Sequence, residues 1–127
     1  MTQKKLIAIV EDEEMLADMY RAKFIQAGFE AEVMTNVSDA LKFLQAKRPD
    51  AVLLDIVLGE ESGLTFLEKR RDIPGGDIIP VVAFSNYDEP KTRNKAIELG
   101  AEEYLLKTGY TPQAIVEKVK GYLSHPF

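Results

Sequence analysis

Short runs of apolar residues, many of them β-branched, alternate along the chain with longer stretches in which apolar residues recur every three or four positions. Runs of four or five such residues, bounded by polar segments, are typical of buried strands. We expect strands at residues 6–10, 31–34, 51–54, 80–84 and 103–106. Strands that alternate with helical stretches predict βαβ units, and therefore a parallel sheet covered by helices.

The stretches between these runs have the spacing and the end signals of five helices. We expect helices at residues 13–27, at 37–47, from about residue 62, at 88–100 and at 111–123. Gly28 and Gly100 mark the ends of the first and fourth helices, because glycine is common just beyond a helix C-terminus. Asp88 is the expected N-cap of the fourth helix, with Pro90 near its first turn.

The composition of the expected strands indicates their order in the sheet. Residues 51–54 and 80–84 are apolar on both faces, as in central parallel strands covered by helices. Residues 31–34 and 103–106 are shorter or carry charge, as edge strands do. Edges at the second and fifth strands fit the order 2-1-3-4-5. We therefore predict an α/β fold with a flavodoxin-like, doubly wound, five-stranded parallel sheet and five helices.

The composition restricts the classes of protein to which the chain can belong. A length of 127 residues with 46% hydrophobic residues fits one packed domain over residues 1–127, with no output domain in this chain. The absence of cysteine excludes a disulfide framework and a thiolate metal site. A net charge of -5 argues against direct nucleic-acid binding, and no apolar run is long enough for membrane insertion. We expect a cytoplasmic location.

Polar residues follow four of the expected strands at the point where each strand ends. The first strand leads into Glu11 and Asp12, the third into Asp55, the fourth into Ser85 and the fifth into Lys107. In an open α/β sheet, ligands bind beyond the carboxyl ends of the strands, near the switch point between the first and third. The predicted strand order therefore places these residues around one site with Asp55 at its centre.

The chemistry of this group favours a metal ion and a phosphoryl group. Three carboxylates held together repel one another unless a cation neutralises them, and an all-oxygen site suits Mg²⁺. A metal and Lys107 would attract a phosphoryl group, and carboxylates such as Asp55 form acyl-phosphate intermediates. Phosphoryl transfer depends mostly on positioning and charge neutralisation, to which the Ser85 hydroxyl would also contribute.

With these residues in this order, the chain resembles the receiver domains of response regulators, including those of chemotaxis, over essentially its whole length. The resemblance rests on the acid pair Glu11-Asp12, on Asp55 in LLDIVLGEESG, on Ser85 in VVAFSN and on Lys107 in YLLK. It implies that Asp55 is the phosphoacceptor and that Glu11, Asp12, Asp55 and the Val57 backbone carbonyl hold Mg²⁺. It further implies that Ser85, Asn86 and Lys107 contact the phosphoryl group and that Ser85 and Tyr104 form the switch.

The resemblance also implies partners and a mode of signalling. A histidine kinase or a phosphotransfer protein would supply the phosphoryl group, and an unknown output protein would bind the face made by the fourth helix, the fifth strand and the fifth helix. It allows a phosphorylation-dependent dimer. Such a domain is not an enzyme in the usual sense, although it assists its own Mg²⁺-dependent phosphorylation and dephosphorylation.

The sequence departs from the family pattern at several positions near the site. Thr108 follows Lys107 where the family commonly has proline, which leaves the position of Lys107 less defined. Gly59 replaces a frequent proline after Asp55, and we expect it to loosen that loop. Asn86 replaces a small residue and is expected to narrow the phosphoryl pocket. The bulk of Val57 and Tyr87 is expected to hinder the attacking water and so lengthen the phosphoryl lifetime.

Some of the charged residues also fit purely structural roles, and the sequence allows more than one function. The acids after the first strand fit a helix N-terminus, a role that we adopt for Glu13 and Glu14 and that stays open for Asp12. Basic residues 69–71 are expected to complement the C-terminal dipole of the third helix.

The most serious alternative function is a receiver-shaped interaction module that is not phosphorylated. A phosphatase with an aspartate nucleophile is disfavoured, because such enzymes carry a second acid two residues after the nucleophile and Val57 stands there. A nucleotide-binding domain is also disfavoured, because the acidic residues 11–14 (EDEE) after the first strand would repel phosphate.

Overall fold

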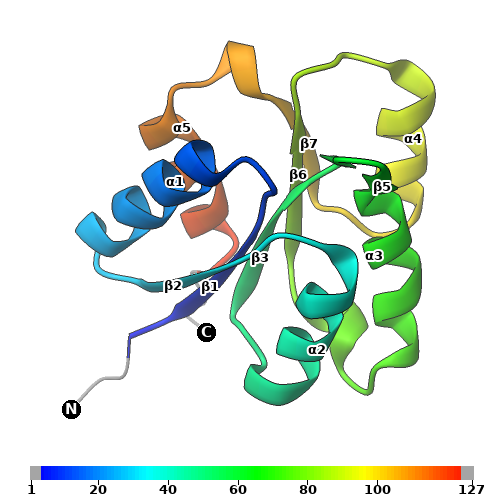
Figure 1. The fold of residues 1–127 in the computed structure, drawn as a ribbon, viewed down its shortest axis with the longest axis horizontal. Helices are drawn as coiled ribbons and strands as arrows, with labels where there is room; N and C mark the ends of the chain where they lie inside the picture. Colours follow the sequence, from blue (N-terminus) through cyan, green and yellow to red (C-terminus); the bar gives the residue numbers. More distant parts are fainter. Residues whose placement is uncertain (1–3, 124–127) are drawn as a thin grey trace.

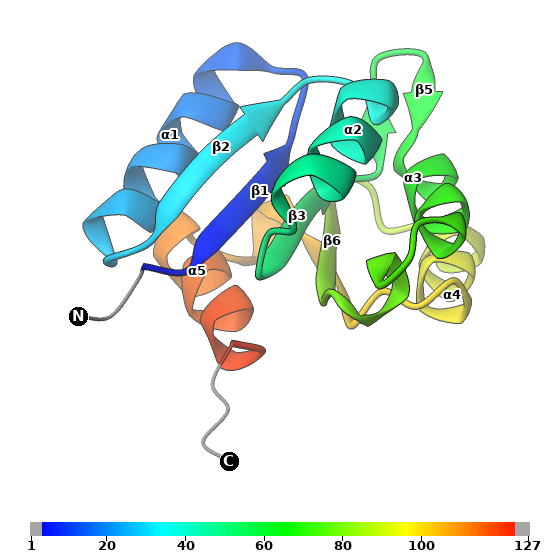
Figure 2. The same ribbon diagram turned by 90° about the horizontal axis from the view of Figure 1, so that it is seen from below.

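A computed structural model describes residues 4–123 of the chain as a central parallel sheet with helices on both faces (Figures 1 and 2). The sheet has the order β2-β1-β3-β6-β7. Its strands are β1 (Leu6–Val10), β2 (Glu30–Met34), β3 (Ala51–Asp55), β6 (Val81–Ser85) and β7 (Glu103–Leu106). Because β6 and β7 are the fourth and fifth strands of the sheet along the chain, the predicted order 2-1-3-4-5 and the predicted edge strands are confirmed.

Helices α1 and α5 cover one face of the sheet, and α2, α3 and α4 cover the other (Figure 2). Their bounds are α1 (Glu14–Gln26), α2 (Val37–Lys47), α3 (Gly63–Lys69), α4 (Pro90–Glu98) and α5 (Pro112–Gly121). Short 3₁₀ turns η1 (Arg70–Asp72), η2 (Gly76–Ile78) and η3 (Lys107–Gly109) follow α3 and β7. The five predicted helices are therefore confirmed in number and order, with ends that differ by a few residues.

The central strand β3 shows why apolar runs without alternation form the middle of this sheet. All five of its residues are buried. Val52 and Leu54 pack in the core under α2, α3 and α4, whereas Ala51 and Leu53 pack in the core against α1 and α5. Successive side chains of a strand point to opposite faces, so both faces of a strand between two helical layers must be apolar.

Side-chain caps mark the start of three helices, and one of them is α3, where Ser62 accepts a hydrogen bond from the Leu64 amide. Asn36 accepts a hydrogen bond from the Asp39 amide at the start of α2, and Thr111 accepts one from the Ala114 amide at the start of α5. The expected cap of α4 is wrong: its N-cap position is Glu89, without a side-chain cap bond. Asp88 instead forms an ion pair with Arg93.

One element was not predicted from the sequence. After β3 the chain forms a hairpin of two short antiparallel strands, β4 (Val57–Leu58) and β5 (Glu61–Ser62), before α3 begins. Strands of two residues are too short to give a periodic hydrophobic signal.

Within residues 4–123, no helix is both long enough and apolar enough to span a membrane. The only histidine of the sequence, His125, lies outside the described residues.

Candidate functional site

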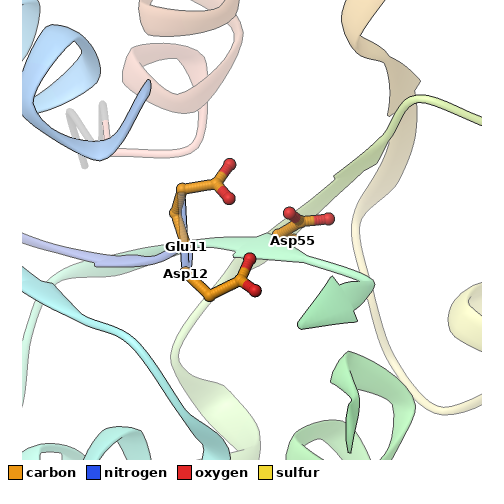
Figure 3. Close-up of side chains that lie close together, drawn as sticks. All are labelled: Glu11, Asp12 and Asp55. Atoms are coloured by element: carbon orange, nitrogen blue, oxygen red, sulfur yellow. The ribbon is translucent and has the colours of Figure 1, made fainter. Parts of the chain in front are cut away.

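The carboxyl ends of the parallel strands bring the polar residues noted in the sequence to one edge of the sheet. β1 leads into Glu11 and Asp12, and Asp55 ends the neighbouring strand β3. Ser85 ends β6, the next strand, and Lys107 follows β7 at the sheet edge. The side chains of the three acids gather beyond the ends of β1 and β3 (Figure 3).

The three acids form a cluster that fits a cation. One carboxylate oxygen from each of Glu11, Asp12 and Asp55 lies within 4.8 Å of the other two. Glu11 is 1% exposed and Asp55 4% exposed, while Asp12 is exposed. Close carboxylates in a buried setting are stabilised by a cation, and hard oxygen ligands are those that Mg²⁺ and Ca²⁺ prefer. The donor set therefore fits Mg²⁺.

Lys107, which follows the edge strand β7, extends its side chain to this cluster. Its Nζ donates to Glu11 Oε1 at 2.9 Å and to Asp55 Oδ2 at 3.0 Å. Burial opposes the charge of Lys107, but the bond with Glu11 and the attraction of Asp55 outweigh it and raise the pKa of Lys107. One ammonium thus faces three carboxylates, and the cluster retains an excess of negative charge.

The burial of Glu11 shifts its pKa. Loss of hydration raises the pKa of Glu11 to about 7, although the hydrogen bond from Lys107 works in the opposite direction. The repulsion of Asp55 adds to the increase, whereas the bond from the Glu13 amide to Glu11 Oε2, at 3.1 Å, lowers it. In the absence of a metal, we therefore expect Glu11 to take up a proton near neutral pH.

An aromatic support of Lys107 was not foreseen from the sequence. Lys107 Nζ lies 4.6 Å from the ring centroid of Phe84, which packs edge-on against Tyr20 at 5.3 Å. A cation over an aromatic face is stabilised, more so when both are shielded from water. The only sequence signal was an aromatic residue directly before the strand-end hydroxyl, and it does not distinguish such a role from ordinary core packing.

The expected phosphoryl-site residues divide between two adjoining pockets. The first, of about 260 Å³, is lined by Glu11, Asp12, Glu13, Asp55, Val57, Gly59, Asn86, Tyr87 and Lys107. The second, of about 250 Å³, contains Ser85 and Tyr104 and shares Val57 and Tyr87 with the first. The structure thus places Asn86 in the pocket of the acids and Ser85 in the pocket of Tyr104.

Ser85 and Tyr104 both bind the backbone of Tyr87. The Tyr87 amide donates to Ser85 Oγ at 3.1 Å, and the Tyr104 hydroxyl donates to the Tyr87 carbonyl at 2.9 Å. Ser85 is buried, Tyr104 is half-buried and Tyr87 is largely exposed. The loop after β6 therefore connects the two residues that the sequence predicts to form a switch.

The β4–β5 hairpin forms one wall of the acidic pocket. The Val57 amide donates to Asp55 Oδ1 at 3.0 Å, so the first hairpin residue is held against the central acid. Gly59 lies in the turn with φ +61°, which a residue with a side chain rarely adopts. The glycine that was expected to loosen a loop is the residue that this two-residue hairpin turn requires.

The departure at Thr108 does not take Lys107 away from the site. Lys107, Thr108 and Gly109 form the 3₁₀ turn η3, and the peptide bonds of the described residues are all trans. Lys107 nevertheless contacts both Glu11 and Asp55.

Of the basic residues 69–71 at the end of α3, Arg70 does not have the expected role. Arg70 does not complement the dipole of its own helix but is buried, 3% exposed, and donates to the carbonyls of Gly76, Ile79 and Gly100. This second buried cation lies toward the amino ends of β6 and β7, away from the acidic cluster. A buried arginine in a basic run gives no sequence signal, because the run alone is typical of a solvated surface.

Comparisons with known proteins agree with this geometry. The family described as the response regulator receiver domain matches residues 7–120. The chain is 31% identical over 117 residues to the phosphate regulon transcriptional regulatory protein PhoB of Rhizobium meliloti, covering 92% of this chain and 51% of that protein. It is 31% identical over 119 residues to the polar-differentiation response regulator DivK of Brucella anthropi, covering 94% of this chain and 96% of DivK.

A solved structure shows the same arrangement of elements. A response regulator from Chloroflexus aurantiacus superposes with a TM-score of 0.87 at 26% identity, over 97% of this chain and 100% of that chain. The chain spans about half the length of PhoB but nearly all of DivK.

Proposed function

The chain belongs to the response regulator receiver domain family, and we propose that it is a phosphoacceptor switch phosphorylated on Asp55. It is a signalling domain of two-component systems and not an enzyme in the usual sense. The observation that carries the proposal is the setting of Asp55, which lies between the acid pair at the end of β1 and the ammonium of Lys107. A carboxylate in the centre of a charged cluster needs a functional reason, because apolar residues would stabilise the same strand end better.

Metal binding is the first part of the proposal. Glu11, Asp12 and Asp55 would hold Mg²⁺ with the Val57 backbone carbonyl, a set of oxygen donors that matches the preference of this ion. When bound, Mg²⁺ would neutralise charge on the carboxylates and on a phosphoryl group. Lys107 already neutralises part of that charge and is positioned to contribute in the same way.

Phosphoryl transfer is the second part. An oxygen of Asp55 would form a bond to phosphorus while the bond from phosphorus to a histidine nitrogen of the donor breaks, and its electron pair stays on the nitrogen. Ser85, Asn86 and Lys107 would contact the transferred group, and their role is positioning and charge neutralisation. The donor is a histidine kinase or a phosphotransfer protein.

Signalling is the third part. Ser85 would move toward phosphorylated Asp55, and Tyr104, linked to the same loop through the Tyr87 carbonyl, would follow. The change would alter the face formed by α4, β7 and α5, to which the output protein binds and through which a phosphorylation-dependent dimer would form. We propose a cytoplasmic location, and one receiver domain over residues 1–127.

The phosphoryl lifetime depends on the rim of the pocket. Val57 is 46% exposed and Tyr87 64% exposed, and both line the acidic pocket. Their side chains would hinder the approach of water to a phosphorylated Asp55. A Tyr87→Ala protein is then expected to dephosphorylate faster than the wild type, and an equal or slower rate would contradict this role.

The test of the proposed function is a Mg²⁺ titration followed by addition of beryllofluoride, observed as amide chemical shifts of residues 85–106. We expect shifts in the wild type at Ser85, Tyr87 and Tyr104, and none of the beryllofluoride-dependent shifts in Asp55→Asn. The proposal would be contradicted if the amide shifts of the wild type did not change, or if the beryllofluoride-dependent changes persisted in Asp55→Asn. Folded protein that binds neither Mg²⁺ nor beryllofluoride would favour the alternative, a receiver-shaped interaction module that is not phosphorylated.

A further inference from the structure

The β4–β5 hairpin carries backbone groups that border the acidic cluster. Val57, on its first strand, contacts Asp55 through its amide. At the turn, a Cβ placed on Gly59 would lie 3.4 Å from Asp12 Oδ2. The position of this hairpin therefore determines the shape of the pocket wall beside two of the three acids.

The hairpin does not belong to the central sheet and has little backbone support of its own. Its two strands of two residues pair only with each other, and an isolated two-stranded hairpin is marginally stable in water. Its base is held by the buried side chain of Leu58 and by the bond from the Gly63 amide to the Ile56 carbonyl, at 2.7 Å. A contact from β5 to an element outside the hairpin would restrict the position of the hairpin further.

Glu61 provides that contact. Its Oε1 accepts a hydrogen bond from the amide of Val37, 24 residues earlier in the chain, at 3.1 Å. Val37 is the first residue of α2, and amides of the first turn have no partner within the helix. Because Asn36 serves the amide of Asp39, Glu61 satisfies a different donor, and its negative charge is favoured at this end of the helix.

We propose that Glu61 is a positioning residue of the metal site, which anchors the hairpin to the N-terminus of α2 and so holds Val57 and Gly59 against Asp55 and Asp12. This inference rests on the proposed function, because it assumes that the acidic cluster binds Mg²⁺. It adds a residue that touches neither the metal nor the phosphoryl group and that lies outside the set expected from the sequence.

Linkage makes the proposal reciprocal. If the bond between Glu61 and α2 favours the metal-binding arrangement of the hairpin, then metal binding must favour that bond by the same free energy. Mg²⁺ is therefore expected to slow hydrogen exchange of the Val37 amide, although Val37 lies in another element.

The experiment compares Glu61→Ala, Glu61→Gln and Glu60→Ala in the full chain, with Mg²⁺ as the only ligand. Glu60 lies beside Glu61 in the hairpin turn, is exposed, and forms no hydrogen bond or ion pair within residues 4–123. Its removal therefore reproduces the loss of one negative charge without the loss of the anchor. Glu61→Gln removes the same charge but keeps a carbonyl oxygen that accepts the Val37 amide.

We expect Glu61→Ala to weaken Mg²⁺ binding about three- to tenfold relative to Glu60→Ala. Glu61→Gln is expected to recover most of the affinity. In the metal-free protein, Glu61→Ala should speed amide exchange at Val37 and Val57, and Glu60→Ala should not. Glu61 is exposed, so these variants are expected to fold, which circular dichroism would verify.

The outcomes separate the two proposals. Equal Mg²⁺ affinities of Glu61→Ala and Glu60→Ala, with normal binding by the wild type, would overturn the positioning role and leave the proposed function intact. Unchanged exchange at Val37 on Mg²⁺ binding would also overturn it. A wild type that binds no Mg²⁺ would instead overturn the proposed function, and this inference with it.

Discussion

Two buried cations, one at each end of the sheet, differ in what surrounds them. Lys107, at the carboxyl ends of the strands, donates to the carboxylates of Glu11 and Asp55. Arg70, toward the amino ends of β6 and β7, donates only to backbone carbonyls, those of Gly76, Ile79 and Gly100. The first lies among opposite charges, and the second among neutral acceptors.

The pKa values of the two groups reflect this difference. Burial lowers the pKa of Arg70, and the nearby acids only partly offset that effect. Burial works against the charge of Lys107 as well, but the carboxylates raise its pKa. Arg70 has a structural role, because its hydrogen bonds connect η2, the segment before β6 and the turn before β7. Lys107 belongs to a site whose negative charge exceeds its own, a setting that fits a further cation.

Replacing the structural cation is expected to have the largest effect on stability. Arg70→Met keeps most of the apolar stem but leaves the carbonyls of Gly76, Ile79 and Gly100 without their donor, so we expect a loss of about 3–5 kcal/mol in the free energy of unfolding. Urea denaturation measures this loss. In Arg71→Met, which removes one exposed bond of 3.4 Å to the Glu98 carbonyl, the change should stay within about 0.5 kcal/mol. Similar losses of unfolding free energy in both variants would contradict the structural role of Arg70.

The acidic end is expected to show a pH dependence that the Arg70 end lacks. The pKa of Glu11 is raised from 4.5 to about 7 in the folded chain, so the folded state binds more protons than the unfolded state between these values. The free energy of unfolding of the metal-free protein should therefore fall by up to about 3 kcal/mol as pH rises from 4.5 to 7, and then level off.

Urea denaturation in EDTA at several pH values measures this fall. The difference between wild type and Glu11→Gln isolates the contribution of Glu11 from that of other acids. A difference that is the same at pH 5 and pH 8 would show that Glu11 is not the titrating group.

Replacing the cation of the site is expected to change metal affinity. Lys107→Met removes an ammonium that competes with a metal for Glu11 and Asp55, so Mg²⁺ should bind about tenfold more tightly in a calorimetric titration. Lys91→Met, on the exposed side of α4, is the matched control and should leave the affinity unchanged. Weaker binding in Lys107→Met would mean that the lysine organises the acids more than it competes for them.

The smallest effect is expected where a single carbonyl accepts from a neutral group. Like Arg70, Tyr104 bonds to a backbone carbonyl, but with one hydroxyl and at a half-buried position. Tyr104→Phe should therefore lose about 1 kcal/mol or less in thermal or urea unfolding. Tyr110→Phe, whose hydroxyl forms no hydrogen bond within residues 4–123, should lose none. A loss in Tyr104→Phe as large as that in Arg70→Met would contradict this ranking.

The sequence predicted much of this fold because its signals are local. Runs such as 51–54 are apolar on both faces only where helices cover both, and this property identified the central strands. The site followed from the fold, since Glu11, Asp12, Asp55, Ser85 and Lys107 are the residues that leave the strands. The N-cap of α4 was wrong because Asp88 had a second partner, Arg93, whose choice no local pattern reveals.

The features that the sequence did not predict depend on contacts between distant segments. Arg70 in a basic run and Glu61 in an acidic run have the composition of solvated surface. Arg70 is buried by segments that follow it in the chain, as far as Gly100. Glu61 accepts a hydrogen bond from Val37, which precedes it. Phe84 supports Lys107 only because β6 and β7 are neighbours.

The sequence by itself determined the order of elements, the order of strands and the set of residues that leave the strands at one edge, because hydrophobic period and strand topology are properties of segments. Only the tertiary structure decided which partner each of these side chains takes. Distances of 2.9 and 3.0 Å from Lys107 to two acids, or of 3.1 Å from Glu61 to the start of α2, depend on how separate elements pack. Hydrogen bonds and ion pairs weaken steeply with distance, so the partners, and with them the electrostatics of the site, follow from packing.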